Sequence, residues 1–249
     1  MPFHRLVLAA LIALPALPAV AQEPAAMTDA ERAAFRAEVR SYLLDNPEVL
    51  TEAIGVLESR EQTRQIEADR ALVSENLAQL TDDGRSWVGG NPDGDVTVVE
   101  FMDYRCPYCR QAFPEVMELV EGDGDIRFIL KEFPILGPQS EMASRFAIAV
   151  QLVNGPDAYE DVHEALMGLQ ADIDEGSLTR LAEALGLDPA PIFERMDDPE
   201  VTETIEANRA LAQTLGISGT PTFVMGSQMV RGYVPLEGMQ AIVADESEG

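Results

Sequence analysis

Apolar residues recur at helical spacing through residues 28–82, a stretch that contains one glycine. Thr28 and Glu31 have the spacing of a capping box, which begins a helix. The Asn46–Pro47 step ends that helix and begins a second, because the residue before proline disfavours helical backbone angles and proline suits a first helical turn. The second helix carries an apolar stripe at i, i+4 and i+7, formed by Leu50, Ile54 and Leu57.

The polar run "ESREQTRQ" interrupts this stripe, which resumes at Ile66, Val73, Leu77 and Leu80. Such narrow stripes leave two interpretations open. The helices form an arm for self-association, or they pack on the rest of the chain. The turn-rich runs "TDDG" and "GGNPDGD" follow and separate this segment from the remainder. We predict an N-terminal helical arm over residues 22–85.

The hydrophobic pattern becomes strand-like after residue 95. "VTVVEFM" (96–102) and "IRFILKEF" (126–133) are runs of β-forming residues, and residues 110–121 between them have a helical pattern. A strand, a helix and a strand in this order predict two parallel strands joined by a right-handed crossover.

The rest of the chain continues this α/β pattern. Residues 139–215 have a helical pattern, residues 220–226 and 228–233 are typical of a hairpin, and residues 235–244 form a closing helix. Strands on both sides of a long helical stretch predict an α/β domain at 86–249 with a helical insertion near 138–215.

The first residues have the pattern of a secretory signal. A short basic start precedes an apolar run from Leu6 to Leu17, and Ala19-Val20-Ala21 has the small-x-small pattern of a cleavage site. Prolines break this run, and it is shorter than the about 20 apolar residues that a membrane-spanning helix needs. We therefore expect residues 1–21 to be a cleaved signal peptide. The protein would then work in the periplasm, where disulfides persist.

The chain is strongly acidic, with a formal net charge of −27 at pH 7. This charge excludes nucleic acid and anionic lipid as partners, because both bind through basic patches. It favours either attraction of basic clients or the solubility of an exported protein.

The chain contains two cysteines, Cys106 and Cys109, in the sequence "DYRCPYCRQ". A structural disulfide between positions three apart closes a very small loop and stabilises little. Structural zinc takes four ligands, and His163 is the only histidine outside the signal peptide. Copper(I) accepts two thiolates and a methionine sulfur, so a copper site stays open beside the interpretation that we favour, a redox couple.

Cys106 stands where the predicted strand ends and the helix begins. Its sulfur would face the unpaired backbone N–H groups and the positive end of the helix dipole, which stabilise the reactive thiolate. Pro107 suits a first helical turn, and Cys109 follows one turn later, within disulfide reach. We predict that Cys106 is the nucleophile and Cys109 its partner in a reversible disulfide.

Two charged residues, Glu100 and Lys131, interrupt the apolar strands. A charge inside a buried strand is costly unless it is paired or functional. We predict that Glu100 and Lys131 pair beneath the cysteines and relay the proton as Cys109 ionises. The alternative is that both lie at strand ends and reach solvent.

Several motifs together resemble the DsbA-like thioredoxin superfamily: "VVEFMDYRCPYC", "KEFPILG", "GTPTFVMG" and "GYVPLEGM", in family order. The resemblance implies a thioredoxin-like fold with an inserted helical domain. It implies a cis Thr220–Pro221 bond that faces the cysteines, with Thr220 offering backbone hydrogen bonds to an extended client. Pro107 and Tyr108 are further candidates for client binding, and Glu100 has the position of the family's buried acid.

The N-terminal run "VRSYLLDNPEVLTEAIGVLE" resembles the corresponding segment of ScsC-type proteins, some of which oligomerise through it and act as disulfide isomerases. Two departures leave the direction of the reaction open. Pro-Tyr stands between the cysteines where the strongest oxidases have Pro-His. Thr220 precedes the cis proline where those oxidases have valine, which is more similar to the isomerase branch.

The leading hypothesis is an exported thiol-disulfide oxidoreductase that forms or isomerises disulfides in protein clients. It would exchange electrons with a membrane or periplasmic redox partner, without a cofactor or resident metal. Two alternatives remain: a metal-tolerance protein whose thiols bind copper, and a holdase that uses the helical arm.

Overall fold

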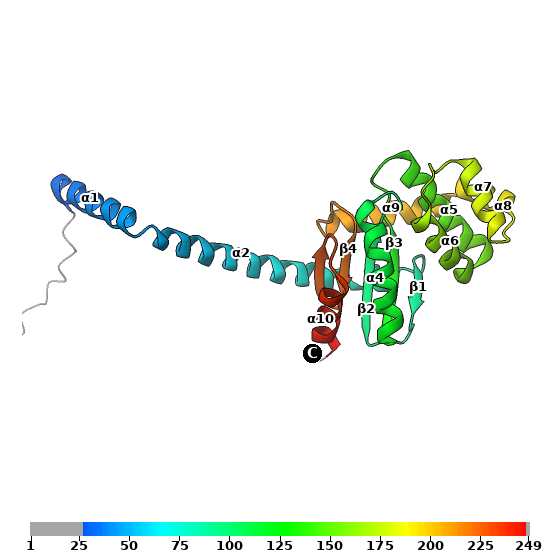
Figure 1. The fold of residues 1–249 in the computed structure, drawn as a ribbon, viewed down its shortest axis with the longest axis horizontal. Coiled ribbons are helices and arrows are strands. Elements are labelled where there is room, and N and C mark those ends of the chain that lie inside the picture. Colours follow the sequence, from blue (N-terminus) through cyan, green and yellow to red (C-terminus); the bar gives the residue numbers. More distant parts are fainter. Residues whose placement is uncertain (1–26, 248–249) are drawn as a thin grey trace, which may run out of the picture. The chain divides into compact units, whose positions relative to one another are not determined.

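The computed structural model describes residues 27–247, drawn as a ribbon in Figure 1. The predicted signal peptide, residues 1–21, lies outside the described residues. Between residues 27 and 247, no helix has both the length and the apolar character needed to cross a membrane. The chain divides into two compact units, with the boundary between Glu58 and Ser59.

The first unit contains α1 (Asp29–Asp45) and the beginning of α2 (Glu48–Glu75). Thr28 and Glu31 form the predicted capping box, because each side chain accepts a hydrogen bond from the other residue's backbone N–H. α1 ends as predicted, with Asn46 as its C-cap.

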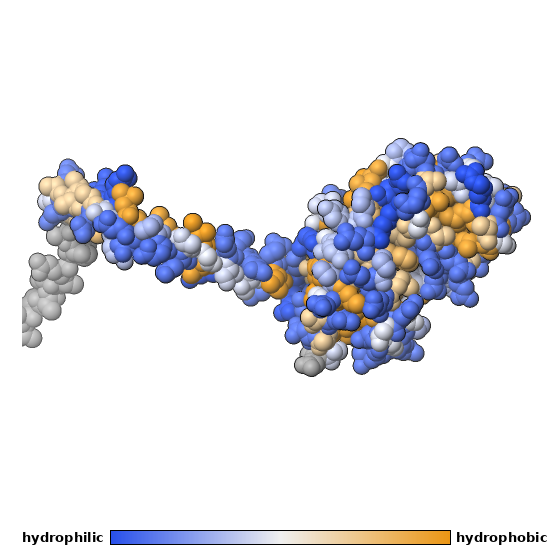
Figure 2. Space-filling model, viewed as in Figure 1, coloured by the Kyte–Doolittle hydropathy of each residue, from blue (hydrophilic) through white to orange (hydrophobic). Residues whose placement is uncertain are grey.

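The apolar side chains of this first unit lie at its surface. α1 contains no buried residue. Leu50, Ile54 and Leu57, the first predicted stripe, are all exposed on α2. Figure 2 shows apolar residues spread along these N-terminal helices.

The second unit is built on a five-stranded sheet with the order β1-β3-β2-β4-β5. β2 (Val96–Met102) and β3 (Ile126–Glu132) are the two predicted strands; they pair in parallel and are connected by α4 (Pro107–Asp123). β4 (Thr222–Met225) and β5 (Gln228–Arg231) form the predicted hairpin, and β4 pairs antiparallel with β2.

β1 (Trp87–Gly90) is an antiparallel edge strand beside β3 that the sequence pattern does not predict. It has four residues and two of them are glycines, so it offers too few side chains to show an alternation of apolar and polar positions.

Helices cover both faces of the sheet. One face carries Val98 and Met102 and packs against α4 and α10 (Leu236–Ser247). The other face carries Val99 and Phe101 and packs against α3 (Leu77–Thr81), the end of α2, and α9 (Pro199–Thr214). Five helices occupy the chain between β3 and β4 (Figure 1), namely α5 (Pro138–Asn154), α6 (Pro156–Gly168), α7 (Glu175–Ala184), α8 (Pro189–Met196) and α9 (Pro199–Thr214). The predicted thioredoxin-like α/β fold with inserted helices is confirmed.

The end of α2 belongs to the second unit. Val73 and Leu80 are buried in the same cluster as the sheet residues Val99 and Phe101. Asp69 of α2 holds the side chain of Arg231 on β5 through two hydrogen bonds of 2.6 and 2.9 Å. The two parts of the predicted arm therefore differ: the stripe before Glu58 is exposed, whereas Val73 and Leu80 are core residues.

Candidate active site

Cys106 is the N-cap of α4, and three residues separate it from the end of β2 at Met102. Its backbone N–H donates to Asp103 O at 3.0 Å, which fixes the turn between strand and helix. Pro107 is the first residue of the helix, and Tyr108 follows with 60% of its surface exposed. Cys106 is 4% exposed and Cys109 is fully buried, and both are reduced thiols in this structure.

The loop before β4 lies against the Cys106 sulfur. The Thr220–Pro221 peptide bond is cis, as the resemblance implies. The Cys106 thiol donates to Thr220 O over 3.1 Å, although 114 residues separate the two in the chain. β4 pairs with β2, and Thr222 near the start of β4 lies opposite Phe101 near the end of β2. The segments that carry Thr220 and Cys106 are therefore held at the same end of these two strands.

The two thiols have opposite acidities. The hydrogen bond from the Cys109 thiol is the main cause that lowers the pKa of Cys106 to about 5, against the effect of burial. The Thr220 side chain and the N–H groups of Cys109 and Tyr108 lower that pKa further. Burial, followed by the hydrogen bond to Cys106 and the charge of Glu100, raises the pKa of Cys109 above that of an ordinary thiol. Cys106 is therefore the sulfur that ionises first.

Glu100 is buried on the sheet face that packs against α4. Its Oε1 has no hydrogen-bond partner among the described residues. Burial, and to a smaller extent the charge of Cys106, raises the pKa of Glu100 to about 8. The carboxyl group therefore holds a proton at neutral pH, close enough to both cysteines to interact with their charges.

The predicted pairing of Glu100 with Lys131 is wrong. The parallel register sets Glu100 opposite Leu130, so Lys131, one residue further along β3, points to the other face of the sheet. There the Lys131 ammonium donates to Asp83 Oδ2 at 2.6 Å and to Gln79 O at 2.9 Å. The alternative is wrong as well, because both charged side chains are buried.

Asp103 is a buried residue of this region that the sequence analysis missed. Its carboxylate accepts hydrogen bonds from the backbone N–H groups of Arg105, Ile135 and Leu136, at 2.8 to 3.0 Å. The side chain thus joins the loop that carries Cys106 to the loop after β3. A short acidic residue directly after a strand is the available sequence signal, because such side chains commonly accept from nearby backbone N–H groups.

Glu132 is a second buried acid that the sequence analysis missed. It accepts hydrogen bonds from the hydroxyl groups of Tyr104, Ser144 and Tyr159, at 2.6 to 2.8 Å. Burial raises its pKa to about 7. Tyr104 stands two residues before Cys106, so this cluster supports the active-site loop from the side of the inserted helices.

Between residues 27 and 247, no group of three His, Cys, Asp or Glu side chains is arranged to hold a metal ion. His163 lies against Tyr104, with Nδ1 at 3.1 Å from the phenol oxygen. The copper hypothesis therefore depends on the two thiols, without a third ligand from these residue types.

The cysteine pair lies at the start of the helix of a parallel βαβ unit, and the loop with the cis proline lies beside it. This arrangement defines a redox protein of thioredoxin type. The model of the DSBA-like thioredoxin domain matches residues 97–244. The chain belongs to this family of thiol-disulfide oxidoreductases. Residues 31–64 also match the copper resistance protein ScsC N-terminal domain.

Solved structures with similar folds include a thioredoxin-like oxidoreductase from Silicibacter pomeroyi. It is 42% identical, with a TM-score of 0.66, over 69% of this chain and 98% of that one. A linker-deletion variant of Proteus mirabilis ScsC is 28% identical, with a TM-score of 0.65, over 90% of this chain and 98% of that one.

The Na⁺/H⁺ antiporter NhaA 3 of Salinispora tropica is a relative of another kind. It is 32% identical over 70% of this chain, which corresponds to 27% of the antiporter. The chain thus spans about a quarter of the length of the antiporters that it matches.

Proposed function

We propose that the protein is an exported thiol-disulfide oxidoreductase that forms or isomerises disulfides in protein clients. One observation supports this most directly: the acidic thiol of Cys106 lies 3.1 Å from Thr220 O in the cis-proline loop, with the buried Cys109 behind it. This arrangement has a nucleophile, a resolving thiol and a backbone segment where an extended client can bind.

The reaction follows from the different acidities of the two sulfurs. In the oxidised enzyme, a client thiolate attacks Cys106 Sγ, a mixed disulfide forms, and the bond to Cys109 breaks. Cys109 leaves as a thiolate and takes a proton, for which protonated Glu100 is the proposed donor. A second client thiolate then displaces Cys106, which departs as the stable thiolate and leaves the client oxidised.

The reverse reaction begins from the reduced enzyme. The Cys106 thiolate attacks a client disulfide, and a client thiolate leaves. If that client thiolate attacks another disulfide in its own chain, the thiolate released there displaces Cys106 from the mixed disulfide, and the client leaves with rearranged disulfides. If it does not, Glu100 in its ionised form accepts the proton of Cys109, and the Cys109 thiolate attacks the mixed disulfide and releases the reduced client.

Client binding is assigned to the surface around Cys106. Thr220 and Pro221 belong to the loop beside the Cys106 sulfur, and the backbone of Thr220 would form hydrogen bonds with an extended client. Pro107 and the exposed Tyr108 border the same sulfur on the side of α4. Clients and the periplasmic or membrane redox partner would use this surface in turn.

The test is refolding of a client with scrambled disulfides, compared with oxidation of the same client in its reduced form. We expect activity in at least one assay and its loss in Cys106→Ser. The reduction potential of the Cys106–Cys109 couple against glutathione decides the direction, since about 30 mV corresponds to about 1.4 kcal/mol for two electrons. A wild-type protein that forms the Cys106–Cys109 disulfide but has no activity in either assay would contradict the proposal.

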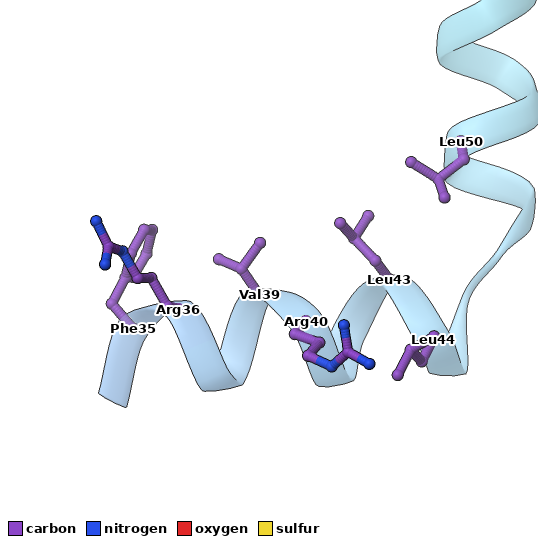
Figure 3. Close-up of a pocket in the computed structure, with 7 residues that line it drawn as sticks. All are labelled: Phe35, Arg36, Val39, Arg40, Leu43, Leu44 and Leu50. Carbon is purple, nitrogen blue, oxygen red and sulfur yellow. The ribbon is translucent and has the colours of Figure 1, made fainter. Parts of the chain in front are cut away.

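The first helical unit is proposed to bind a second copy of the chain. Phe35, Val39 and Leu43 lie along one side of α1, and Leu50 of α2 faces them across a groove of about 380 Å³ (Figure 3). Phe35 is 58% exposed. Exposed apolar surface of this kind marks contact sites between proteins. The match of residues 31–64 to an ScsC N-terminal domain supports a role for the segment of its own.

The molecular mass in solution tests this assembly. Removing residues 22–58 leaves in place Asp69, Val73 and Asp83, which contact the sheet unit, whereas a deletion to residue 85 would remove them. We expect the deleted protein, and the variant Phe35→Glu, to have the mass of one chain while the parent is larger. A parent with the mass of one chain would exclude self-association.

Copper binding is a second candidate function, and the match to a copper resistance protein domain favours it. Anaerobic titration of the reduced protein with copper(I), in the presence of a competing chelator, tests it. Stoichiometric tight binding that is lost in Cys109→Ser, together with no activity on clients, would favour copper over disulfide exchange.

A further inference from the structure

A pocket separate from the cysteines lies between α4, α6 and β1, with a volume of about 300 Å³. Its interior is apolar and aromatic, with Trp87, Phe113, Met117 and Phe128 among the lining residues. The carboxylates of Glu121, Glu160 and Glu164 surround its mouth. Pockets of this size are at the small end of those that hold ligands.

His163 lines this pocket, and one of its ring nitrogens makes no hydrogen bond among residues 27–247. The imidazole is 4% exposed, and burial lowers its pKa to about 3, so it is neutral. When Glu132 is a carboxylate, the single hydroxyl proton of Tyr104 is donated to it, and the contact of 3.1 Å between His163 Nδ1 and the Tyr104 oxygen is then donated by Nδ1–H. Nε2 therefore carries a lone pair. It has no partner among residues 27–247.

The carboxylates at the mouth have no positively charged partners within the part of the chain that the structure describes. None of the ion pairs found between residues 27 and 247 includes Glu121, Glu160 or Glu164. Burial, and then the charges of Asp161, Asp157, Glu121 and Glu164, raises the pKa of Glu160. The mouth of the pocket is thus a region of negative potential above an aromatic floor.

We propose that this pocket binds an organic cation with N–H donors on a short apolar chain, such as a primary alkylammonium or a guanidinium group. The apolar chain would lie against Trp87, Phe113 and Met117. One N–H would donate to His163 Nε2, and the positive charge would be balanced by the carboxylates and favoured by the aromatic rings. This site does not use the cysteines, so it is independent of the proposed disulfide chemistry.

The chain carries reporters for both parts of the pocket. Trp87 is its only tryptophan, and His163 is one of two histidines. Titration of the full protein with n-butylammonium chloride at constant ionic strength should change the tryptophan fluorescence and shift the His163 imidazole NMR signals with one saturable curve. The His163→Gln variant identifies those signals.

Two further probes separate the contributions. n-Butyltrimethylammonium has the charge but no N–H donor, and we expect it to bind at least about fivefold more weakly, because it cannot bond Nε2. n-Butanol lacks the charge and should give no saturable change. A capped lysine amide distinguishes the source: binding similar to that of the free amine indicates a basic side chain of a partner protein, and binding of the free amine alone indicates a small metabolite.

Matched double variants test the carboxylates. Glu160→Gln with Glu164→Gln should weaken n-butylammonium binding at least about tenfold. Glu175→Gln with Glu183→Gln removes the same charge from exposed positions on α7, outside the pocket, and should leave the binding unchanged. Both pairs should retain wild-type reactivity of Cys106. The absence of a saturable change in both signals, or equal affinities in the two double variants, would overturn the proposal.

Discussion

Opposite faces of the sheet bury Lys131 and Glu100, two ionisable side chains with different surroundings. Lys131 and Glu100 lie on paired strands and are both inaccessible to solvent. Lys131 has two partners, Asp83 and Gln79, and it connects the end of the helical segment to the sheet. Glu100 has an oxygen without a hydrogen-bond partner among the described residues, and it lies beside two thiols. The first charge is satisfied and structural, whereas the second is left able to gain and lose a proton.

The largest effect should come from the sulfur on the Glu100 side. Cys106→Ser removes the nucleophile, and we expect client refolding to fall at least about a thousandfold, to the level of the uncatalysed reaction. Cys109→Ser is the matched control, because it keeps the nucleophile and should accumulate mixed disulfides with clients that gel electrophoresis can detect. Retained turnover in Cys106→Ser would assign the chemistry elsewhere.

On the opposite face, Lys131→Met should change stability and not chemistry. The substitution leaves Asp83 without its cation, and breaking a buried pair of this kind costs about 3 kcal/mol. Urea denaturation measures the loss. Arg127, on the same strand, is in no ion pair found between residues 27 and 247, so Arg127→Met should cost less than about 1 kcal/mol. A change in the alkylation rate of Cys106 in the Lys131 variant would show that the two faces are coupled.

Glu100→Gln should separate catalysis from stability on the first face. The amide cannot exchange a proton with Cys109, so we expect client turnover to slow by about tenfold. The rate at which Cys106 itself is alkylated should change much less. Equal turnover in wild type and variant across the pH range would exclude Glu100 as the proton donor.

The Glu100→Gln variant should also differ from wild type in how its free energy of unfolding depends on pH. Because the pKa of Glu100 is about 8 in the folded protein and near 4.5 in the unfolded chain, the folded state binds the extra proton between these values. Its contribution to stability is therefore present below pH 4.5 and lost as the pH rises to about 8. The reduced Glu100→Gln variant escapes this loss, so at pH 8 its free energy of unfolding should exceed that of wild type by about 4 kcal/mol, because each pH unit between the two pKa values contributes about 1.4 kcal/mol. The difference should vanish near pH 4.

The smallest expected effect is on the acidity of Cys106. Thr220→Val removes a side chain that lowers the pKa of Cys106, so that pKa should rise by less than about one unit. Alkylation by iodoacetamide over a pH series measures it. The wild-type midpoint should lie near pH 5, and a midpoint at the value of an unperturbed cysteine, about 8.5, would contradict the described electrostatics.

The positions of β2 and β3 could be predicted from the sequence, but the register between these neighbouring strands could not. The alternation in "VTVVEFM" correctly placed Glu100 on the face of Val98 and Met102. A shift of one residue in register exchanges the faces of a whole strand, and nothing within "IRFILKEF" states its register against its neighbour. For this reason the side of Lys131, and its partner 48 residues earlier in the chain, became visible only in the folded structure.

The apolar stripes show a similar limit. Leu50 and Val73 both fit a helical period, yet Leu50 is exposed and Val73 is buried against the sheet. Periodicity identifies an apolar face but not the surface that covers it. The nucleophile, by contrast, was predictable, because the end of a strand and the start of a helix are local features on either side of Cys106.

Lys131 is the chain's single lysine, and its side chain is 0% exposed. Amine-directed dyes and immobilisation reagents should therefore modify the native protein at its α-amino group, so that every molecule carries its label at one end. Acylation of Lys131 requires the segment around Asp83 to detach from the sheet first. The slow appearance of that second label, followed by mass spectrometry, would time how often this part of the protein opens.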